Sequence, residues 1–234
     1  MTTPAPAPVS SSLPSAPSRP HLEKFFAKVD PVRGKLIFAV DATASRQPTW
    51  DVAAKLTSEM FNAAAATGGL DVQLVYYRGI SECVASRWFS DARSLSTIMS
   101  GVMCRSGETQ IGKVLAHARK EHQRQKIGGV VLITDTCEEN PNDLYAAARE
   151  LGNVPVFLFQ EGEERHVTEI FARIAEITGG AVAKFDISAA ARLAELLKAV
   201  AVFAAGGAEA LKALKSEAAR LLLTQIRKPP IGKQ

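Results

Sequence analysis

The stretch LIFAVDATASRQPTW, residues 36–50, joins a strand-like run to a set of oxygen-bearing side chains. Leu36–Val40 is continuously apolar, a pattern typical of a strand that is buried on both faces of a parallel sheet. Asp41, Thr43 and Ser45 follow at alternate positions. The end of a buried strand is therefore predicted to carry a cluster of oxygen ligands.

The remaining strand-like and helical patterns predict an α/β fold. Apolar runs recur at Val130–Ile133 and Val154–Phe159, and residues 179–186 supply a last strand. Residues 70–79 and 82–90 are two consecutive strand-like runs around a glycine turn, which predicts a hairpin with an antiparallel edge strand. Helical periodicity appears between the strands, at Val52, Leu56, Met60 and Ala63, at Ile111, Val114, Leu115 and Ala118, and at Ile170, Ile174 and Ile177. We expect a doubly wound, mostly parallel, Rossmann-like sheet with helices on both faces.

Composition divides the chain into three segments. Residues 1–20 are almost entirely Pro, Ala, Ser and Thr, and this composition predicts a disordered leader. Residues 21–205 are expected to form the α/β domain, beginning with a short helix over residues 21–29. Residues 206–234 begin with two helix-breaking glycines and are expected to form an amphipathic helix and a basic tail. The apolar positions of this helix predict packing on its own domain or, alternatively, docking of a partner.

Charge and cysteine usage narrow the class of protein. The net charge of +4 is mild, and the basic residues are spread along the chain without aromatic interleaving, which gives little support for nucleic-acid binding. Three widely separated cysteines (Cys83, Cys104 and Cys137) fit a reducing compartment better than a disulfide framework. No apolar run approaches the roughly 20 residues that a membrane-spanning helix needs. We expect a cytoplasmic protein without a membrane span.

Two further polar residues are predicted to reach the edge of the sheet where Asp41 lies. Asp135 follows the strand Val130–Ile133, and Thr109 precedes a predicted helix. Ligands of open α/β sheets bind beyond the carboxyl ends of the strands. Two carboxylates and three hydroxyls form an all-oxygen set suited to Mg²⁺, with Mn²⁺ or Ca²⁺ as alternatives. If the acids act through water, the ion lacks negative charge and attracts a carboxylate from a partner protein.

The pattern Asp41-x-Thr43-x-Ser45, followed by Thr109 and Asp135 in fold order, resembles the metal-ion-dependent adhesion site (MIDAS) of the von Willebrand factor type A (VWA) domain family. The resemblance implies that the three hydroxyls are direct or near-direct metal ligands. It also implies that the two acids support them through water.

The resemblance covers about Lys35 to Phe203 and departs from the family pattern at two positions. Thr43 stands where the family motif has Ser, and Thr136 stands where the second acid is often followed by Gly. Residues beside the motif are candidates for a partner-binding rim: Arg46, Glu138 and Glu139. The two glutamates have alternatives, because either could be a solvated surface residue or occupy the open position of the metal.

The leading functional hypothesis is a binding module that is not an enzyme and that uses a Mg²⁺-type MIDAS to engage an acidic residue of a partner protein. The family resemblance implies a bacterial, ATP-driven multiprotein machine as the setting. One alternative is a metal-dependent hydrolase or phosphatase, although Asp-x-Thr lacks the second acid of haloacid-dehalogenase-like enzymes and so lacks their general acid. Another is a scaffold with a vestigial metal site that binds through its C-terminal helix.

Overall fold

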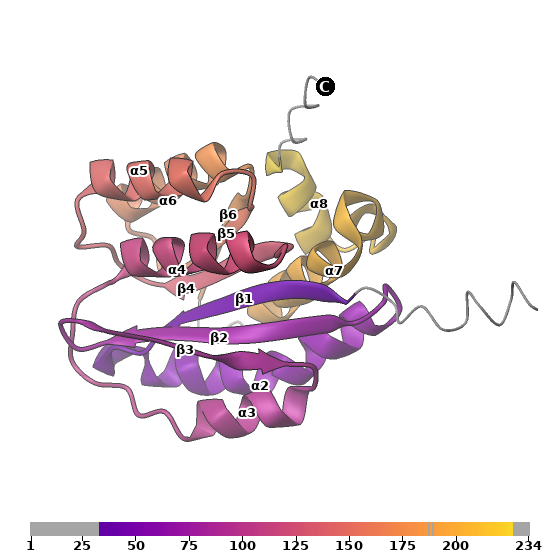
Figure 1. Ribbon diagram of the computed structural model, residues 1–234, viewed down its shortest axis with the longest axis horizontal. Coiled ribbons are helices and arrows are strands. Elements are labelled where there is room, and N and C mark those ends of the chain that lie inside the picture. The colour runs from indigo at the N-terminus through magenta and orange to yellow at the C-terminus, as the bar shows by residue number, and fades with distance from the viewer. Residues whose placement is uncertain (1–32, 187, 189, 227–234) are drawn as a thin grey trace, which may run out of the picture. The chain divides into compact units, whose positions relative to one another are not determined.

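A mixed six-stranded sheet forms the centre of the part of the chain that the computed structural model describes, residues 33–186, 188 and 190–226 (Figure 1). The strand order is β3-β2-β1-β4-β5-β6. The strands are β1 (Gly34–Asp41), β2 (Leu70–Arg78), β3 (Glu82–Phe89), β4 (Gly129–Thr134), β5 (Val156–Glu161) and β6 (Ala181–Phe185). The predicted leader 1–20 and the predicted helix 21–29 lie outside the described residues.

The pairing of the strands confirms the predicted doubly wound sheet with one antiparallel edge strand. β1 pairs in parallel with β2 on one side and β4 on the other, and β3 closes the sheet edge antiparallel to β2. From β1 the chain proceeds outward through β2 to β3, and from β4 it proceeds outward through β5 to β6. The strand order therefore reverses between β1 and β4, which is the point where open α/β sheets bind ligands.

Helices cover both faces of the sheet, as Figure 1 shows for α4, α5 and α6 on one side and α2 and α3 on the other. Their bounds are α2 (Gln47–Ala65), α3 (Ala92–Ser100), α4 (Ile111–Arg124), α5 (Pro141–Leu151), α6 (Arg165–Thr178), α7 (Ala190–Ala213) and α8 (Glu217–Gln225). α7 and α8 join α2 and α3 in one hydrophobic core, and α4, α5 and α6 enclose the other. The run Leu36–Val40 is fully buried because it lies between these two layers.

The last two helices pack on their own domain. The backbone at Gly207 leaves the helical conformation at φ 69°, so the predicted glycine break interrupts α7. Leu211, Ala218 and Leu222 are buried in the core beyond that break. Gln225 also pairs through its side-chain amide with the backbone N–H and carbonyl of Val182 on the edge strand β6. The apolar face of α8 is therefore covered by the sheet and by α7.

Candidate metal centre

A cavity of about 310 Å³ opens at the carboxyl end of β1 and β4, where the strand order reverses. Its lining comes from three loops and consists of Asp41, Thr43, Ala44, Ser45, Ser106, Gly107, Thr109, Asp135, Thr136 and Glu138. The five residues predicted to hold a metal are all among them. The structure therefore brings together three segments that are distant in the sequence, residues 41–45, 106–109 and 135–138.

Asp41 forms the floor of the cavity at the end of β1 and is 1% exposed. Its Oδ1 accepts a hydrogen bond from the Thr43 N–H at 2.7 Å, and its Oδ2 accepts one from the Thr134 hydroxyl at 2.9 Å. Burial raises the pKa of Asp41 above its usual value, the two hydrogen bonds offset part of that rise, and the charge of Asp135 adds to it. Asp41 is thus a carboxylate whose negative charge is incompletely compensated.

The loop after Asp41 turns sharply and presents two hydroxyls to the cavity. The hydrogen bond from Thr43 to Asp41 is a local side-chain turn of the kind that Asp favours. A short 3₁₀ turn, η1 (Ala44–Arg46), follows and leads directly into α2, whose first turn contains Pro48. Thr43 is half-buried and Ser45 is exposed. Both hydroxyls therefore lie on the solvent side of Asp41.

Thr109 joins the loop before α4 to the loop after β4. Its hydroxyl accepts a hydrogen bond from the Glu138 N–H at 3.1 Å, and its own N–H donates to the Glu138 carboxylate at 2.8 Å. Thr109 is 4% exposed. A hydroxyl oxygen that accepts one N–H keeps a second lone pair, which can take a cation. This reciprocal pair fixes Thr109 next to the loop of Asp135.

Glu139, expected at the rim, is not in the cavity lining itself but interacts with the side chain of the lining residue Thr109. Its carboxylate accepts hydrogen bonds from the N–H groups of Ile111 and Gly112, the latter at 2.9 Å. These groups belong to the first turn of α4, where backbone N–H groups have no partner within the helix and a negative charge is favourable. Burial raises the pKa of Glu139, and these N–H groups counteract the rise. Glu139 anchors the helix that follows Thr109.

Arg46, expected on the partner-binding rim, is not part of the cavity lining but pairs with a carboxylate that is. Its guanidinium lies 3.1 Å from Asp135 Oδ2 and 2.7 Å from Glu161 Oε2. Glu161 lies outside the cavity lining, and its role as the partner of Arg46 was missed by the sequence analysis. The signal was present, because Glu161 ends the third buried strand just as Asp41 ends the first.

The second loop also approaches the cavity through its backbone, with Ser106 and Gly107 in the lining. A Cβ atom on Gly107 would lie 2.2 Å from the backbone nitrogen of Gly79 in the β2–β3 turn, so glycine is required for this close approach. The Glu108 N–H donates to the Gly79 carbonyl at 3.1 Å, and the Arg105 N–H donates to the Ala42 carbonyl at 3.0 Å. The loop is thereby attached to the segments that directly follow β1 and β2.

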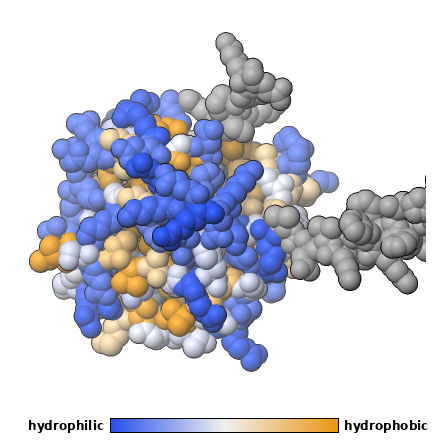
Figure 2. All heavy atoms as spheres, viewed as in Figure 1, coloured by the Kyte–Doolittle hydropathy of each residue, from blue (hydrophilic) through white to orange (hydrophobic). Residues whose placement is uncertain are grey.

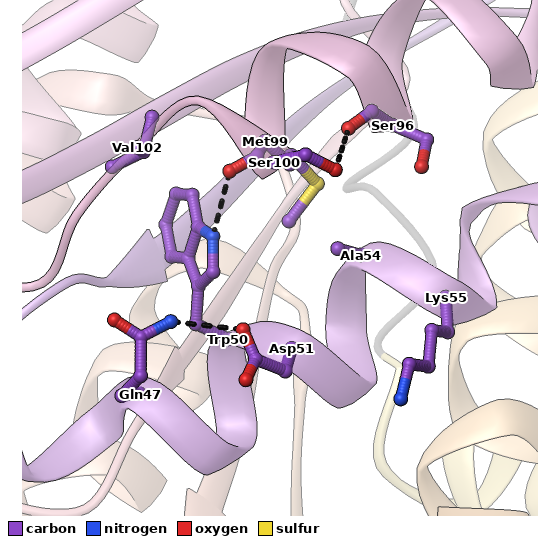
Figure 3. A pocket seen from close by; sticks show the side chains of 9 residues that line it. All are labelled: Gln47, Trp50, Asp51, Ala54, Lys55, Ser96, Met99, Ser100 and Val102. Carbon is purple, nitrogen blue, oxygen red and sulfur yellow. Dashed lines mark hydrogen bonds between the residues drawn. The ribbon is translucent and has the colours of Figure 1, made fainter.

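A second cavity, of about 230 Å³, lies between α2 and α3 (Figure 3). The Trp50 indole N–H donates to the Met99 carbonyl at 3.0 Å, and the Gln47 amide donates to Asp51 at 2.8 Å. The Gln47 side-chain oxygen also accepts the Cys104 N–H at 3.2 Å. The last of these bonds connects the start of α2 with the loop that carries Thr109, so the second cavity borders a support of the first.

Large apolar side chains are exposed close to the first cavity. Ile80 is 83% exposed in the β2–β3 turn, and Met103 is 70% exposed in the loop that leads to Thr109. Arg78 connects the two segments by donating to the Met103 carbonyl at 2.5 Å. Figure 2 shows one face of the molecule, on which hydrophilic residues predominate and hydrophobic ones form small patches.

The donor set fits a hard divalent cation. Its five predicted ligands all offer oxygen, and Asp41 carries charge that burial leaves incompletely compensated. Within the described residues there is no group of three or more His, Cys, Asp or Glu side chains placed to hold a metal. The cavity instead combines two carboxylates with three hydroxyls, and Mg²⁺ is commonly bound through one or two carboxylates while it keeps several waters.

The described helices include none that is long and apolar enough to cross a membrane. No protein-family model matches the sequence, and no curated protein matches it either. The likeness to known proteins is therefore one of structure.

Solved structures share the architecture of this chain. An aerotolerance-related membrane protein from Bacteroides fragilis has a TM-score of 0.56 at 17% identity, over 72% of this chain and 98% of that one. The VWA domain of SpRpn10 has a TM-score of 0.55 at 14% identity, over 70% and 95%. Proximal thread matrix protein 1 from the mussel byssus, with a zinc-occupied MIDAS motif, has a TM-score of 0.55 at 16% identity, over 72% and 46%. The chain has the fold of a VWA domain.

Proposed function

We propose that this chain is a protein-binding module that holds Mg²⁺ or a similar divalent cation in the cavity and uses it to bind a carboxylate of a partner. The observation that carries the proposal is the convergence of Asp41 and Asp135 with three hydroxyls, from Thr43, Ser45 and Thr109, in one solvent-open cavity. The residues that would hold the ion are these five.

The chemistry of the donor set favours an acidic partner group. Hydroxyls are neutral ligands, and Asp41 is already hydrogen-bonded through both carboxylate oxygens. A divalent cation bound mainly by hydroxyls and water keeps much of its positive charge. An incoming carboxylate supplies the missing negative charge by taking the place of one of the waters that Mg²⁺ keeps.

The surroundings of the cavity suit a protein partner. The exposed side chains of Ile80 and Met103 are carried by segments that border the cavity, and burying them against a partner adds a hydrophobic contribution to binding. The zinc-occupied MIDAS motif of proximal thread matrix protein 1 supports a divalent cation as the ligand of this fold.

We also propose that the chain is not an enzyme and that it acts in the cytoplasm. The lining of the cavity contains neither histidine nor cysteine, the usual general base and thiol nucleophile. The three cysteines of the chain, Cys83, Cys104 and Cys137, are free thiols. A role beside an ATP-driven multiprotein assembly remains part of the proposal and rests on the sequence resemblance. The alternative of a scaffold that binds through its last helix is disfavoured, because Leu222 and its neighbours on α8 are buried.

Calorimetric titration of the chelator-treated protein with Mg²⁺ and Mn²⁺ tests the proposal. We expect one binding site in the wild type and its loss in Asp41→Ala. Asp71→Ala is the matched control, because Asp71 lies on the neighbouring strand β2 but near the amino ends of the strands, away from the cavity. Absence of binding in the wild type, or equal binding by Asp41→Ala, would contradict the metal site.

Affinity capture from a cell lysate, in Mg²⁺ and in chelator, then tests the partner. A specific partner should be retained in Mg²⁺ and released by chelator. Ile80→Ser should weaken its retention while leaving the Mg²⁺ affinity unchanged. A partner held equally in chelator would show that binding does not use the cation.

A further inference from the structure

Arg46 places a fixed positive charge against one of the two cavity acids. Its guanidinium bridges Asp135 and Glu161, at 3.1 Å and 2.7 Å. The side chains are largely shielded, with exposed fractions of 15% for Arg46, 15% for Glu161 and 28% for Asp135. Because arginine stays protonated in proteins, this charge is permanent. Asp135 thus has a positive partner even without a metal.

Glu161 and α2 determine where the guanidinium lies. The Glu161 carboxylate accepts a hydrogen bond from the hydroxyl of Thr49 as well as the ion pair from Arg46. Thr49 is 2% exposed in the first turn of α2, and Glu161 ends β5. Two separate elements therefore hold Arg46 in reach of Asp135.

The two acids of the cavity, Asp41 and Asp135, differ in whether a positively charged side chain pairs with them. Asp41 accepts hydrogen bonds from neutral groups, Thr43 and Thr134, whereas Asp135 is paired with the cation of Arg46. Ser45 is a predicted metal ligand, and Arg46 Nε lies 3.4 Å from its hydroxyl oxygen. The guanidinium therefore contacts two of the five groups that a divalent cation would use.

We propose that Arg46 is a built-in counter-cation of the cavity, which neutralises Asp135 when no divalent cation is bound and is displaced from Asp135 when one binds. The proposal rests on the function proposed above, because it assumes that the cavity takes a cation. A divalent ion and a guanidinium that share one carboxylate repel each other. Arg46 therefore stabilises the metal-free protein and weakens its affinity for Mg²⁺, and Glu161 limits this effect by sharing the guanidinium.

Three variants separate this role from a general effect of charge: Arg46→Gln, Glu161→Gln and the double variant. In Mg²⁺ and Mn²⁺ titrations of the full chain, Arg46→Gln should bind about tenfold more tightly than the wild type, a change of about 1.4 kcal/mol. Glu161→Gln should bind Mg²⁺ more weakly than the wild type. Without Glu161, the guanidinium of Arg46 is no longer shared between the two acids and pairs with Asp135, so it competes more strongly with the ion. The double variant has the formal charge of the wild type, yet it should still bind more tightly.

Arg105→Gln is the matched control. Arg105 is exposed on the loop that carries Thr109, so the substitution removes one positive charge from the same edge of the sheet without touching Asp135. We expect its Mg²⁺ affinity to stay within about twofold of the wild type, because exposed charges are strongly screened. Circular dichroism checks that each variant is folded.

The possible results distinguish this proposal from the one it rests on. A double variant that binds Mg²⁺ no more tightly than the wild type overturns the counter-cation and leaves the metal site standing. Binding by Arg46→Gln and the double variant, with none by the wild type, supports the counter-cation and contradicts a metal-loaded wild type. Absence of binding in every variant overturns both proposals.

Discussion

Each end of the β1–β2 pair carries an aspartate, and the two aspartates differ in the charge of their partners. At the amino end, Asp71 lies opposite Lys35 and accepts contacts from Arg33 at 2.6 Å and from Lys35 at 3.2 Å. At the carboxyl end, Asp41 lies opposite Tyr77 and accepts hydrogen bonds from the neutral groups of Thr43 and Thr134.

The consequence is a difference in the direction of the pKa shift. Burial alone would raise the pKa of Asp71, but Arg33, Ser90 and Lys35 outweigh it and hold that pKa below its usual value. At Asp41 burial prevails and the pKa is raised. The acid at the amino end of the sheet is thus neutralised by neighbouring cations, whereas the acid at the carboxyl end has a charge that a ligand can compensate.

The largest expected effect is on metal binding at the carboxyl end. Asp135→Asn should weaken Mg²⁺ binding about 10- to 100-fold, because an acid that supports a metal through water is replaced by a neutral amide. Calorimetric titration measures the change, and Asp71→Asn should leave the affinity unaltered. Equal losses of Mg²⁺ affinity in Asp135→Asn and Asp71→Asn would show that metal binding is not specific to the carboxyl end of the sheet.

The amino end should respond through stability. Asp71→Asn should lower the free energy of unfolding by about 0.5–1 kcal/mol at pH 7, the range for a partly exposed ion pair. The lowered pKa of folded Asp71 means that its contribution is present above an unfolded pKa of about 3.9 and is lost as pH falls through the folded value. Urea unfolding at pH 7 and at the lowest pH where the protein stays folded should show the difference shrinking.

The same substitution at Asp41 should have the opposite sign in chelator. Asp41→Asn should raise the free energy of unfolding by about 0.5 kcal/mol at pH 7, because it removes a buried charge while its amide still meets Thr43 and Thr134. The raised pKa of folded Asp41 favours folding below about pH 3.9, and that contribution is lost as pH rises through the folded value. The gain from Asn should therefore grow with pH. Destabilisation at pH 7 would show that Asp41 is compensated in the metal-free protein.

The sequence predicted the fold and the meeting of the site residues for one physical reason. Parallel strands begin and end at common edges, so apolar runs that end in Asp41 and Asp135 place both acids at one edge. Thr109 was predictable because it precedes a helix that begins at the same edge. These inferences need the order of the elements and no side-chain geometry.

The contacts of the charged residues were not predictable in the same way. Arg46 was expected on a rim, but its partner Glu161 comes from β5, and the pairing depends on how two distant elements align. Glu139 was expected beside the cavity, and the sequence did not show that its carboxylate accepts the unpaired N–H groups of α4. Spacing along the chain does not reveal which of several nearby acceptors a long side chain will choose.

The most direct test of the central claim is anomalous diffraction from crystals grown with Mn²⁺. We expect one manganese peak in the cavity, within coordination distance of hydroxyl oxygens of Ser45, Thr43 or Thr109, with Asp41 acting on it through water. A cavity without a manganese peak in crystals that bind Mn²⁺ elsewhere, or Arg46 still paired to Asp135 with no ion beside it, would show that the cavity is not a metal site.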